Sequence, residues 1–551
     1  MKHAYRAALA LCLAHLPGST ALAQPPDPSG QLEALIAEYV AWQRQDDGRD
    51  PIFTQAAFES GLQKQKNLLD RLRALDGARL DREQLTDRRY LLGVLETDML
   101  IARQQRRWEN DPGMYLPSRA LGLLLDPTAT DPAADRAEAL EVLLERASAQ
   151  FGLARESLGH PPRRFTREAI FQARNTLDSI QEGSAAFAGL PVRDTLDRFF
   201  GALEAHVAFL ENELLPRSTG SWMFGRDNYE RVLRERWFLD ADAADMLERG
   251  KRAFAETEAL AQEVAERIRP GAHWTEVYEQ LAEHHPPAAG IKQAYQAQMD
   301  AARAFVINHQ LVSLPAGERV VTIDTPPAMR RSSPFGTFQS VSPHDQNMEG
   351  KLILTPIESW MSEEQREQRL RSHHDAWIPV IAVHEAYPGH HVHALKLREN
   401  SRVLRRVARE PIFVEGWGLF TEELMFELGF LRGDDVRLTQ LRNRLWRAAR
   451  VILDASLHTG QMTFDDAVRF LVDKVRFEPY AAELEVGMYI RRPTYVLGYL
   501  VGMQELMAIR EEYVSRFGEP EPPSQFYDRL LSVGALPPAL VRAELLDPER
   551  G

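Results

Sequence analysis

Apolar side chains recur every three or four residues along most of the first 310 positions, which is the period of an amphipathic helix. Two clear examples are Leu32, Leu35, Ile36, Tyr39 and Val40, and then Leu140, Leu143, Leu144 and Ala147. Proline or glycine interrupts the pattern at Pro161-Pro162, at Pro191, around Gly220 to Gly225, and at Pro286-Pro287. The pattern therefore predicts helix after helix from about residue 31 to 310, with no repeat of fixed length.

The pattern changes between residues 315 and 356. Runs 319–323 and 351–355 are rich in strand-forming residues, and turn residues such as Pro326-Pro327 and Ser333-Pro334 lie between them. These runs predict a small sheet just ahead of the next helices. An open edge of such a sheet can hold an extended peptide by backbone pairing, but a hairpin without that role fits the sequence equally well.

Helices are predicted again after residue 365. Apolar residues keep the helical spacing from Leu438 to Ile452, and Gly433 predicts a break before that helix. A proline-rich link at 520–523 precedes a short last helix. The whole pattern predicts a mainly α protein, in which a large helical body carries a small β-sheet.

The pair His384-Glu385 opens the segment with the most specific chemistry. The familiar zinc-hydrolase helix places two histidines four residues apart on one face, but the residue four after His384 is Pro388. The next histidines, His390 and His391, are six and seven residues later. On an unbroken helix the sixth position faces away and the seventh lies ~10.5 Å along the axis. Neither could share a metal with His384, so the helix must break between the two ligands.

Pro388-Gly389 can produce that break, because proline removes a helical donor and glycine accepts unusual dihedrals. We expect His384 and His390 to be metal ligands and Glu385 to be the general base, with His391 as the alternative to His390. A zinc hydrolase needs three protein ligands, an open position for water and a base beside that water. A His-Glu pair by itself is usually a solvated helix face.

Glu415 is the expected third ligand. It follows His390 by 25 residues (415 − 390), enough for a turn and the start of another helix, and lies among Phe413, Gly416 and Trp417. Glu422, two turns later on the same face, is a possible partner for a ligating histidine. The competing interpretation of Glu415 is a buried structural acid.

Asp454 and His458 lie four residues apart on the next helix, so their side chains can touch. A carboxylate orients a histidine and favours its protonated form, which could stabilise an oxyanion. A surface ion pair is the commoner meaning of this spacing.

Three tyrosines and two arginines stand between residues 485 and 502. Of these we expect Tyr499 to donate to the oxyanion. Tyr489 and Tyr495 could equally pack with their hydroxyls at the edge of the core. Arg491 or Arg492 could hold a peptide carboxylate in a two-pronged pair.

These motifs resemble the bacterial "domain of unknown function 885" family. The resemblance covers nearly the whole chain after residue 23. It rests on residues 108–115, 224–229, 384–391, 415–417, 454–458 and 485–502. It implies a helical fold like the oligopeptidase and dipeptidyl-carboxypeptidase zincins, with a deep channel for short peptides and zinc on His384, His390 and Glu415. The chain departs from the expected pattern at Met488, Tyr495 and Leu500, where Arg, Gln and Lys are expected.

Composition narrows the setting. The chain has 551 residues, 44% hydrophobic and 26% charged, with a net charge of −14. An acidic chain without basic blocks argues against nucleic acid and anionic membranes as partners. Lys2 and Arg6, an apolar stretch and Ala21-Leu22-Ala23 predict a signal peptide over residues 1–23. The single cysteine, Cys12, lies within it and follows a leucine, which disfavours a lipid anchor. The alternative to a cleaved signal peptide is an uncleaved membrane anchor.

We therefore expect three parts: a signal peptide at 1–23, an N-terminal helical region at 24–310 and a catalytic region at 311–551. The expected activity is Zn²⁺-dependent hydrolysis of short peptides in the periplasm or outside the cell, with no stable membrane insertion. Glu385 would take a proton from the attacking water, while His458, oriented by Asp454, and Tyr499 would stabilise the oxyanion. The alternatives are a non-catalytic peptide-binding protein and a zinc hydrolase of a non-peptide amide or ester. The sequence leaves the oligomeric state open.

Overall fold

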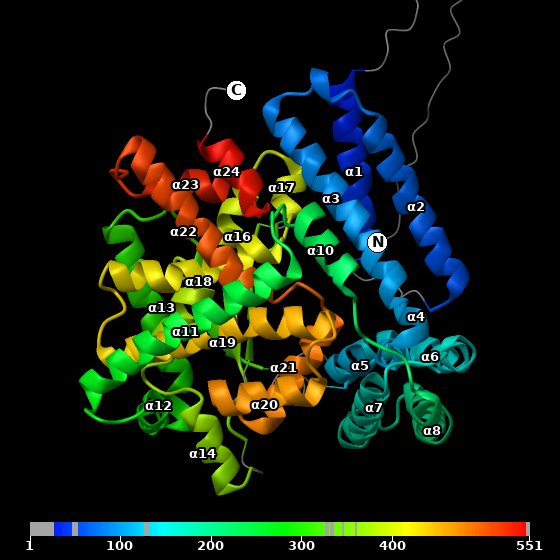
Figure 1. Cartoon of the computed structure of the whole chain (residues 1–551). Helices are drawn as coiled ribbons and strands as arrows, with labels where there is room; N and C mark the ends of the chain where they lie inside the picture. The colour runs from blue at the N-terminus through cyan, green and yellow to red at the C-terminus, as the bar shows by residue number, and fades with distance from the viewer. Residues whose placement is uncertain are drawn as a thin grey trace, which may run out of the picture.

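The computed structural model describes residues 27–46, 53–125, 132–325, 330, 336–343, 346–358 and 361–546. The protein is mainly helical with one small sheet, as the sequence predicts (Figure 1). The expected signal peptide at 1–23, with Cys12, lies outside the described residues. So do the turn residues Pro326-Pro327 and Ser333-Pro334.

Helices follow one another through the described residues from Pro28 to Asn308. They are α1 (Pro28–Asp46), α2 (Gln55–Ala74), α3 (Arg82–Gln105), α4 (Arg107–Asn110), α5 (Ser118–Leu124), α6 (Ala133–Ser157), α7 (Arg163–Gly183), α8 (Val192–Phe209), α9 (Leu215–Arg217), α10 (Arg226–Glu235), α11 (Ala243–Ile268), α12 (Trp274–Leu281) and α13 (Ile291–Asn308). The predicted breaks at Pro161-Pro162, at Pro191, at 220–225 and at Pro286-Pro287 all fall between helices.

A second series of helices follows the sheet. They are α14 (Glu363–Arg371), α15 (Ile378–Glu385), α16 (His390–Glu399), α17 (Val403–Val407), α18 (Pro411–Glu427), α19 (Asp434–His458), α20 (Phe464–Val475), α21 (Pro479–Arg491), α22 (Leu497–Phe517), α23 (Ser524–Ser532) and α24 (Pro538–Leu546). Gly433 precedes α19 with φ 90°, a conformation that glycine adopts without strain, and so allows the turn into this helix.

The buried apolar side chains form two main cores. The larger runs from Leu32 in α1 to Leu546 in α24, and the smaller runs from Phe53 to Leu214. Helices α5 to α8, which supply most of the smaller core, stand together at the lower right of Figure 1. Helix α11 packs along α19 inside the larger core. The predicted division at residue 310 therefore does not follow a division of the core, because helices on both sides of it are packed together.

The sheet has three strands in the order β1-β3-β2. β1 (Arg319–Asp324) pairs in parallel with β3 (Glu349–Leu354), and the short β2 (Gly336–Gln339) pairs antiparallel with β3. The sequence predicts β1 and β3 but not β2, whose four residues give too short a pattern to detect. A Cβ on Gly350 in β3 would lie 2.7 Å from Nδ1 of His391, so the central strand packs directly against the start of α16.

Helices α18 and α22 cross at very close range because glycines face each other. A Cβ on Gly416 would come within 2.6 Å of the backbone of Gly502, and one on Gly498 within 2.7 Å of the backbone of Pro411. Close approach of two backbones needs residues without side chains. The crossing brings the residues just before α22 next to the first turns of α18, where Glu415 lies.

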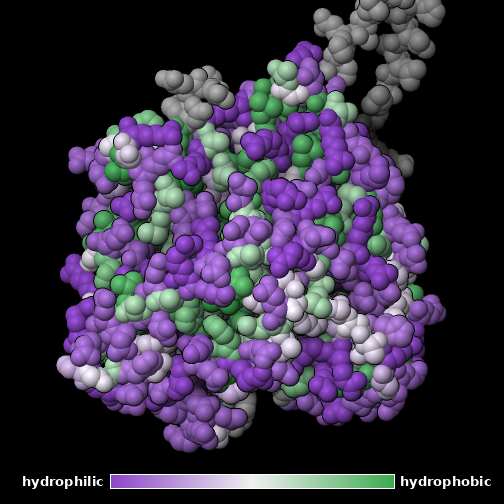
Figure 2. Space-filling model, viewed as in Figure 1, coloured by the Kyte–Doolittle hydropathy of each residue, from purple (hydrophilic) through white to green (hydrophobic). Residues whose placement is uncertain are grey.

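The molecular face in Figure 2 is mostly hydrophilic, with hydrophobic residues scattered between the charged ones. None of the described helices combines the length and the apolar composition that crossing a bilayer requires.

Candidate metal centre

The helix that carries His384 breaks where the sequence predicts. α15 ends at Glu385 and α16 begins at His390, with four residues between them. The backbone N–H of Gly389 turns back to the carbonyl of Val383 at 3.1 Å. A Cβ on Gly389 would lie 1.8 Å from the carbonyl oxygen of His384, so only glycine fits this turn.

The indole of Trp417 holds the break from the neighbouring helix. Its Nε1 donates to the carbonyl of Pro388 at 2.9 Å, with a longer contact to that of Gly389 at 3.3 Å. These are carbonyl groups that the interrupted helix leaves without helical partners. Trp417 is fully buried on α18, two residues after Glu415, so the same helix fixes the turn and supplies the expected third ligand.

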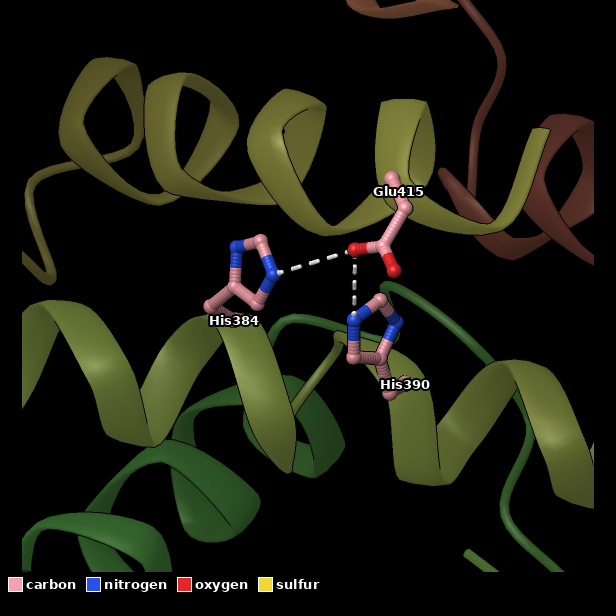
Figure 3. Close-up of side chains that lie close together, drawn as sticks. All are labelled: His384, His390 and Glu415. Atoms are coloured by element: carbon pink, nitrogen blue, oxygen red, sulfur yellow. Dashed lines mark ion pairs between the residues drawn. The ribbon is translucent and has the colours of Figure 1, made fainter. Parts of the chain in front are cut away.

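His384, His390 and Glu415 point toward one another from α15, α16 and α18 (Figure 3). Oε2 of Glu415 lies 3.9 Å from Nε2 of His384 and 3.4 Å from Nε2 of His390. One ligand atom from each of the three residues lies within 4.8 Å of the others. Ligand atoms ~2.1 Å from a tetrahedral zinc are about 3.4 Å apart, so this donor set fits the ion after small adjustments. It is the only such cluster of histidine, cysteine or acidic residues among those described.

Helix α18 also orients the ring of His384. Nδ1 of His384 donates to Oε1 of Glu422 at 2.8 Å, which leaves Nε2 facing the other ligands. This is the carboxylate–histidine arrangement that orients metal-bound imidazoles. Gly418 makes room for the ring, because a Cβ there would lie 2.7 Å from it.

The acidic side chains of the cluster hold a proton on histidine. Burial lowers the pKa of His384, but its interactions with Glu415 and Glu422 outweigh burial and raise the pKa to about 10. Burial raises the pKa of Glu415, but contacts with His384 and His390 hold it well below its usual range. A metal ion would have to displace this proton, because only neutral imidazole ligates.

His391 belongs to a different cluster. Its Nε2 donates to Oε2 of Glu318 at 2.9 Å, and the hydroxyl of Tyr387 donates to the same oxygen at 2.7 Å. The geometry thus places His390, and not His391, with His384 and Glu415.

Glu385, the expected base, is half-buried at the end of α15. Its charge acts on both His384 and Tyr295, so it lies close to the cluster. Among the described residues its carboxylate makes no hydrogen bond or ion pair, which leaves it available to a water molecule.

Asp454 and His458 occupy a buried position whose contacts differ from those expected. Nε2 of His458 donates to the backbone carbonyl of Tyr489 at 3.1 Å and lies 3.7 Å from Asp454. Burial lowers the pKa of His458 to about 4 and raises that of Asp454 to about 8. The protonated form of His458 that the sequence suggested is therefore not favoured, and the alternative of a surface ion pair is not found, because both side chains are buried in the core. Neither makes a hydrogen bond or ion pair with the three ligands within the part of the chain described, and their catalytic role stays a prediction.

From the sequence, Tyr495 could equally be a packing residue or a hydrogen-bond donor. In the structure it contacts Glu415 directly. Its hydroxyl donates to Oε1 of Glu415 at 3.2 Å. The ring of Tyr499, the expected donor, lies 6.4 Å away from that of Tyr495 between centroids. Burial, and then the charge of Glu415, raise the pKa of Tyr499 well above its usual range, so the phenol stays protonated. The sequence held one signal for the position of Tyr495: it precedes Tyr499, the expected donor, by four residues.

Among the described residues, neither Arg491 nor Arg492 contacts His384, His390 or Glu415. Arg491 pairs with Glu168 at 2.6 Å and lies over Phe165, and Arg492 lies over Tyr495. Arg491, suggested as a binder of a peptide carboxylate, is thus already paired with the carboxylate of Glu168.

Comparisons with known proteins place the chain in a family and a fold. The profile of a family described as "Bacterial protein of unknown function (DUF885)" matches residues 36–545. A solved structure titled as "a putative lipoprotein of unknown function from Shewanella oneidensis" has a TM-score of 0.76 at 19% identity. A second, "the putative lipoprotein from Colwellia psychrerythraea", has a TM-score of 0.74 at 15% identity. Each alignment covers 94% of this chain and 99% of the other. No curated protein matches the chain.

Proposed function

Because this chain belongs to the DUF885 family of bacterial proteins, whose members are described only as of unknown function, we propose its activity from the site. We infer that it is a zinc-dependent peptidase that hydrolyses short peptides outside the cytoplasm. The observation that carries this proposal is the convergence of His384, His390 and Glu415 with Glu385 beside them. The interrupted helix that joins the two histidines would serve as the zincin-type helix.

Each residue of the site has a chemical task in this proposal. His384, His390 and Glu415 would hold the metal, which when bound would polarise the scissile carbonyl and acidify a water molecule. Glu385 would hold the attacking water and accept its proton, then pass the proton to the leaving amine. Tyr499 would donate to the negative charge that develops on the carbonyl oxygen.

The position of the site favours small substrates. The ligand side chains are only 4–15% exposed, so a folded protein surface could not reach them. The proposed substrate is an extended peptide of a few residues, which would reach them through an oligopeptidase-like channel. Export from the cytoplasm is supported by the signal-like pattern at 1–23 and by the titles of the two similar structures, each of which reads "putative lipoprotein".

The test separates the base from the ligands. Glu385→Gln keeps the shape of the side chain but removes its proton affinity. We expect peptide hydrolysis to fall about 100- to 10,000-fold, while elemental analysis finds the zinc content unchanged. Glu364→Gln, an exposed change in α14, is the control and should alter neither.

Three outcomes would count against the proposal. Loss of zinc from Glu385→Gln would make Glu385 a ligand instead of the base. Retention of zinc by His390→Ala would remove the metal centre as described. Zinc binding without hydrolysis of any di- or tripeptide in a mixed panel would favour a binding protein or a hydrolase of another amide or ester.

A further inference from the structure

Helix α19 carries two buried guanidinium groups next to the metal centre, and only one has a carboxylate partner. Arg450 pairs with Glu485 at 3.0 Å. Arg447, which is 5% exposed, makes no ion pair among the described residues. Its Nη1 donates to the carbonyl of Asn443 in its own helix at 3.3 Å, and its buried Nε has no partner.

The surroundings of Arg447 connect it to the metal centre on two sides. Its guanidinium carbon lies 5.7 Å from the ring centroid of Tyr499, which stands beside the Tyr495 that donates to Glu415. On the other side, the charge of Glu422, the carboxylate that holds His384, acts on Arg447. Arg447 therefore lies within the electrostatic field of the centre without pairing with its acids.

Asn443 adds a second unsatisfied group on the same face. It precedes Arg447 by four residues, one helical turn. Its side chain is 0% exposed, yet neither its amide nitrogen nor its amide oxygen has a hydrogen-bond partner. Asn443 thus presents a buried amide without a partner. Arg447 presents a buried cation that bonds one backbone carbonyl and lies over the rings of Trp446 and Tyr499, but has no acidic partner among the described residues.

A buried cation is costly to keep without an acidic partner. A group from outside the chain could supply that partner. The planar guanidinium matches a carboxylate in shape and charge. Given the peptidase activity proposed above, on which this inference rests, we propose that Arg447 and Asn443 bind a carboxylate of the peptide substrate. Short peptides carry one at the C-terminus, and an acidic side chain is the other source. The protein would then act near the free C-terminus of its substrates.

The experiment measures binding without turnover, so that it does not depend on hydrolysis. Zinc-loaded Glu385→Gln protein is titrated by calorimetry with one N-acetylated tetrapeptide in three forms: the free acid, the C-terminal amide, and an amide that contains one glutamate. We expect the free acid to bind about 10- to 100-fold more tightly than the plain amide, as a charge-assisted hydrogen bond allows.

Variants at Arg447 assign that preference. Arg447→Gln, made in the same background, should abolish it, and Arg447→Lys should keep part of it. Arg442→Gln is the matched control, because Arg442 is also buried on α19 with an unsatisfied Nε but packs over Tyr278 and Phe477. It should leave the preference unchanged. Circular dichroism and zinc content confirm folding; if Arg447→Gln does not fold, Arg447→Lys and the acid–amide comparison still decide.

Each result supports or overturns the inference. Tight binding of the glutamate-containing amide supports a carboxylate site but assigns it to an acidic side chain. Equal affinity for acid and amide, a preference that survives Arg447→Gln, or no peptide binding at all would overturn it. A protein that prefers the acid but hydrolyses no peptide would overturn the peptidase and leave the carboxylate site standing.

Discussion

At the scale of single residues, the environments of the acidic side chains separate their tasks. Glu415 is held by a tyrosine hydroxyl and lies close to two imidazoles, whereas Glu385 makes no such contact among the described residues. Glu422 is fully buried, and one of its oxygens accepts from His384 while the other has no partner. The fixed position of Glu415 suits a metal ligand, and the free carboxylate of Glu385 suits a base. The buried carboxylate of Glu422 suits the task of orienting a histidine.

Glu422→Gln tests the last of these tasks. Glutamine keeps an acceptor oxygen but loses the charge that strengthens the bond to His384. We expect zinc affinity to fall about 10- to 100-fold, measured by competition with a chelator of known affinity. Glu427→Gln, at the exposed end of the same helix, should have no effect. Equal zinc affinity in the parent and Glu422→Gln would show that Glu422 does not act through His384.

The choice between His390 and His391 shows what a sequence cannot supply at this scale. Both follow the predicted break, and nothing local distinguishes them. The structure decides through Glu318, which lies 73 residues before His391 in the sequence and accepts its Nε2 proton. Tyr495 is similar, because its contact with Glu415 depends on the approach of two helices that are distant along the chain.

At the scale of elements, glycines set the distances on which the site depends. Gly389 permits the turn between α15 and α16, Gly416 lets α22 approach α18, and Gly418 gives the ring of His384 its space. The sequence shows Gly416 beside Glu415, and the break was predictable from Pro388-Gly389 because two histidines cannot share a metal along a straight helix. The partners that these glycines approach were not predictable, since they come from other helices.

Gly418→Ala should damage the metal centre more than the fold. The added methyl group would meet a ring that Glu422 holds in place, so the imidazole must shift by several tenths of an ångström. We expect zinc affinity to fall at least about tenfold, because ligand positions are strict. Metal titration followed by elemental analysis measures this.

The control for that substitution is Gly201→Ala in the interior of α8, where a Cβ meets nothing within 4 Å. Alanine there should stabilise the protein by about 0.5–1 kcal/mol, since it favours the helix and restricts the unfolded chain. Thermal unfolding measures this gain in stability. A Gly418→Ala protein with normal zinc affinity would mean that the ring of His384 can move freely.

At the scale of the whole molecule, both cores contain buried histidines that the fold keeps neutral. Burial lowers the pKa to about 4 for His206 in the smaller core, and for His373 and His458 in the larger one. Their folded pKa lies below the unfolded value of about 6.5. The stability they allow is therefore present above pH 6.5 and is lost as the pH falls toward 4, because the unfolded chain then binds more protons. Asp454 has the opposite sign, since its raised pKa removes stability as the pH rises from about 4 to 8.

Acid sensitivity can be traced to one of these histidines. His206 stacks on Phe151, with ring centroids 4.3 Å apart, and neither of its nitrogens has a partner. His206→Phe should reduce the loss of urea stability between pH 7 and pH 4.5 by about 1–3 kcal/mol. His309→Phe, an exposed histidine stacked on Phe305, should leave the pH dependence unchanged. Identical pH profiles in the parent and His206→Phe would contradict the assignment.

The division of the molecule was harder to predict than its helices. Local periodicity predicts where a helix lies, but the packing of α11 along α19 joins segments about 190 residues apart, and no local pattern records that. Apart from Phe53, the smaller core is built from residues between Tyr115 and Leu214, whereas segments on both sides of that stretch supply the larger core.

The contact of Trp417 with the turn between α15 and α16 has a practical consequence. One short stretch, 415–422, contains a ligand, the residue that grips the turn, the space for an imidazole and the acid behind it. A designer who wished to graft this centre onto another scaffold would therefore have to transfer the turn between α15 and α16 together with segment 415–422. The histidine motif alone would lack the contacts that fix the turn.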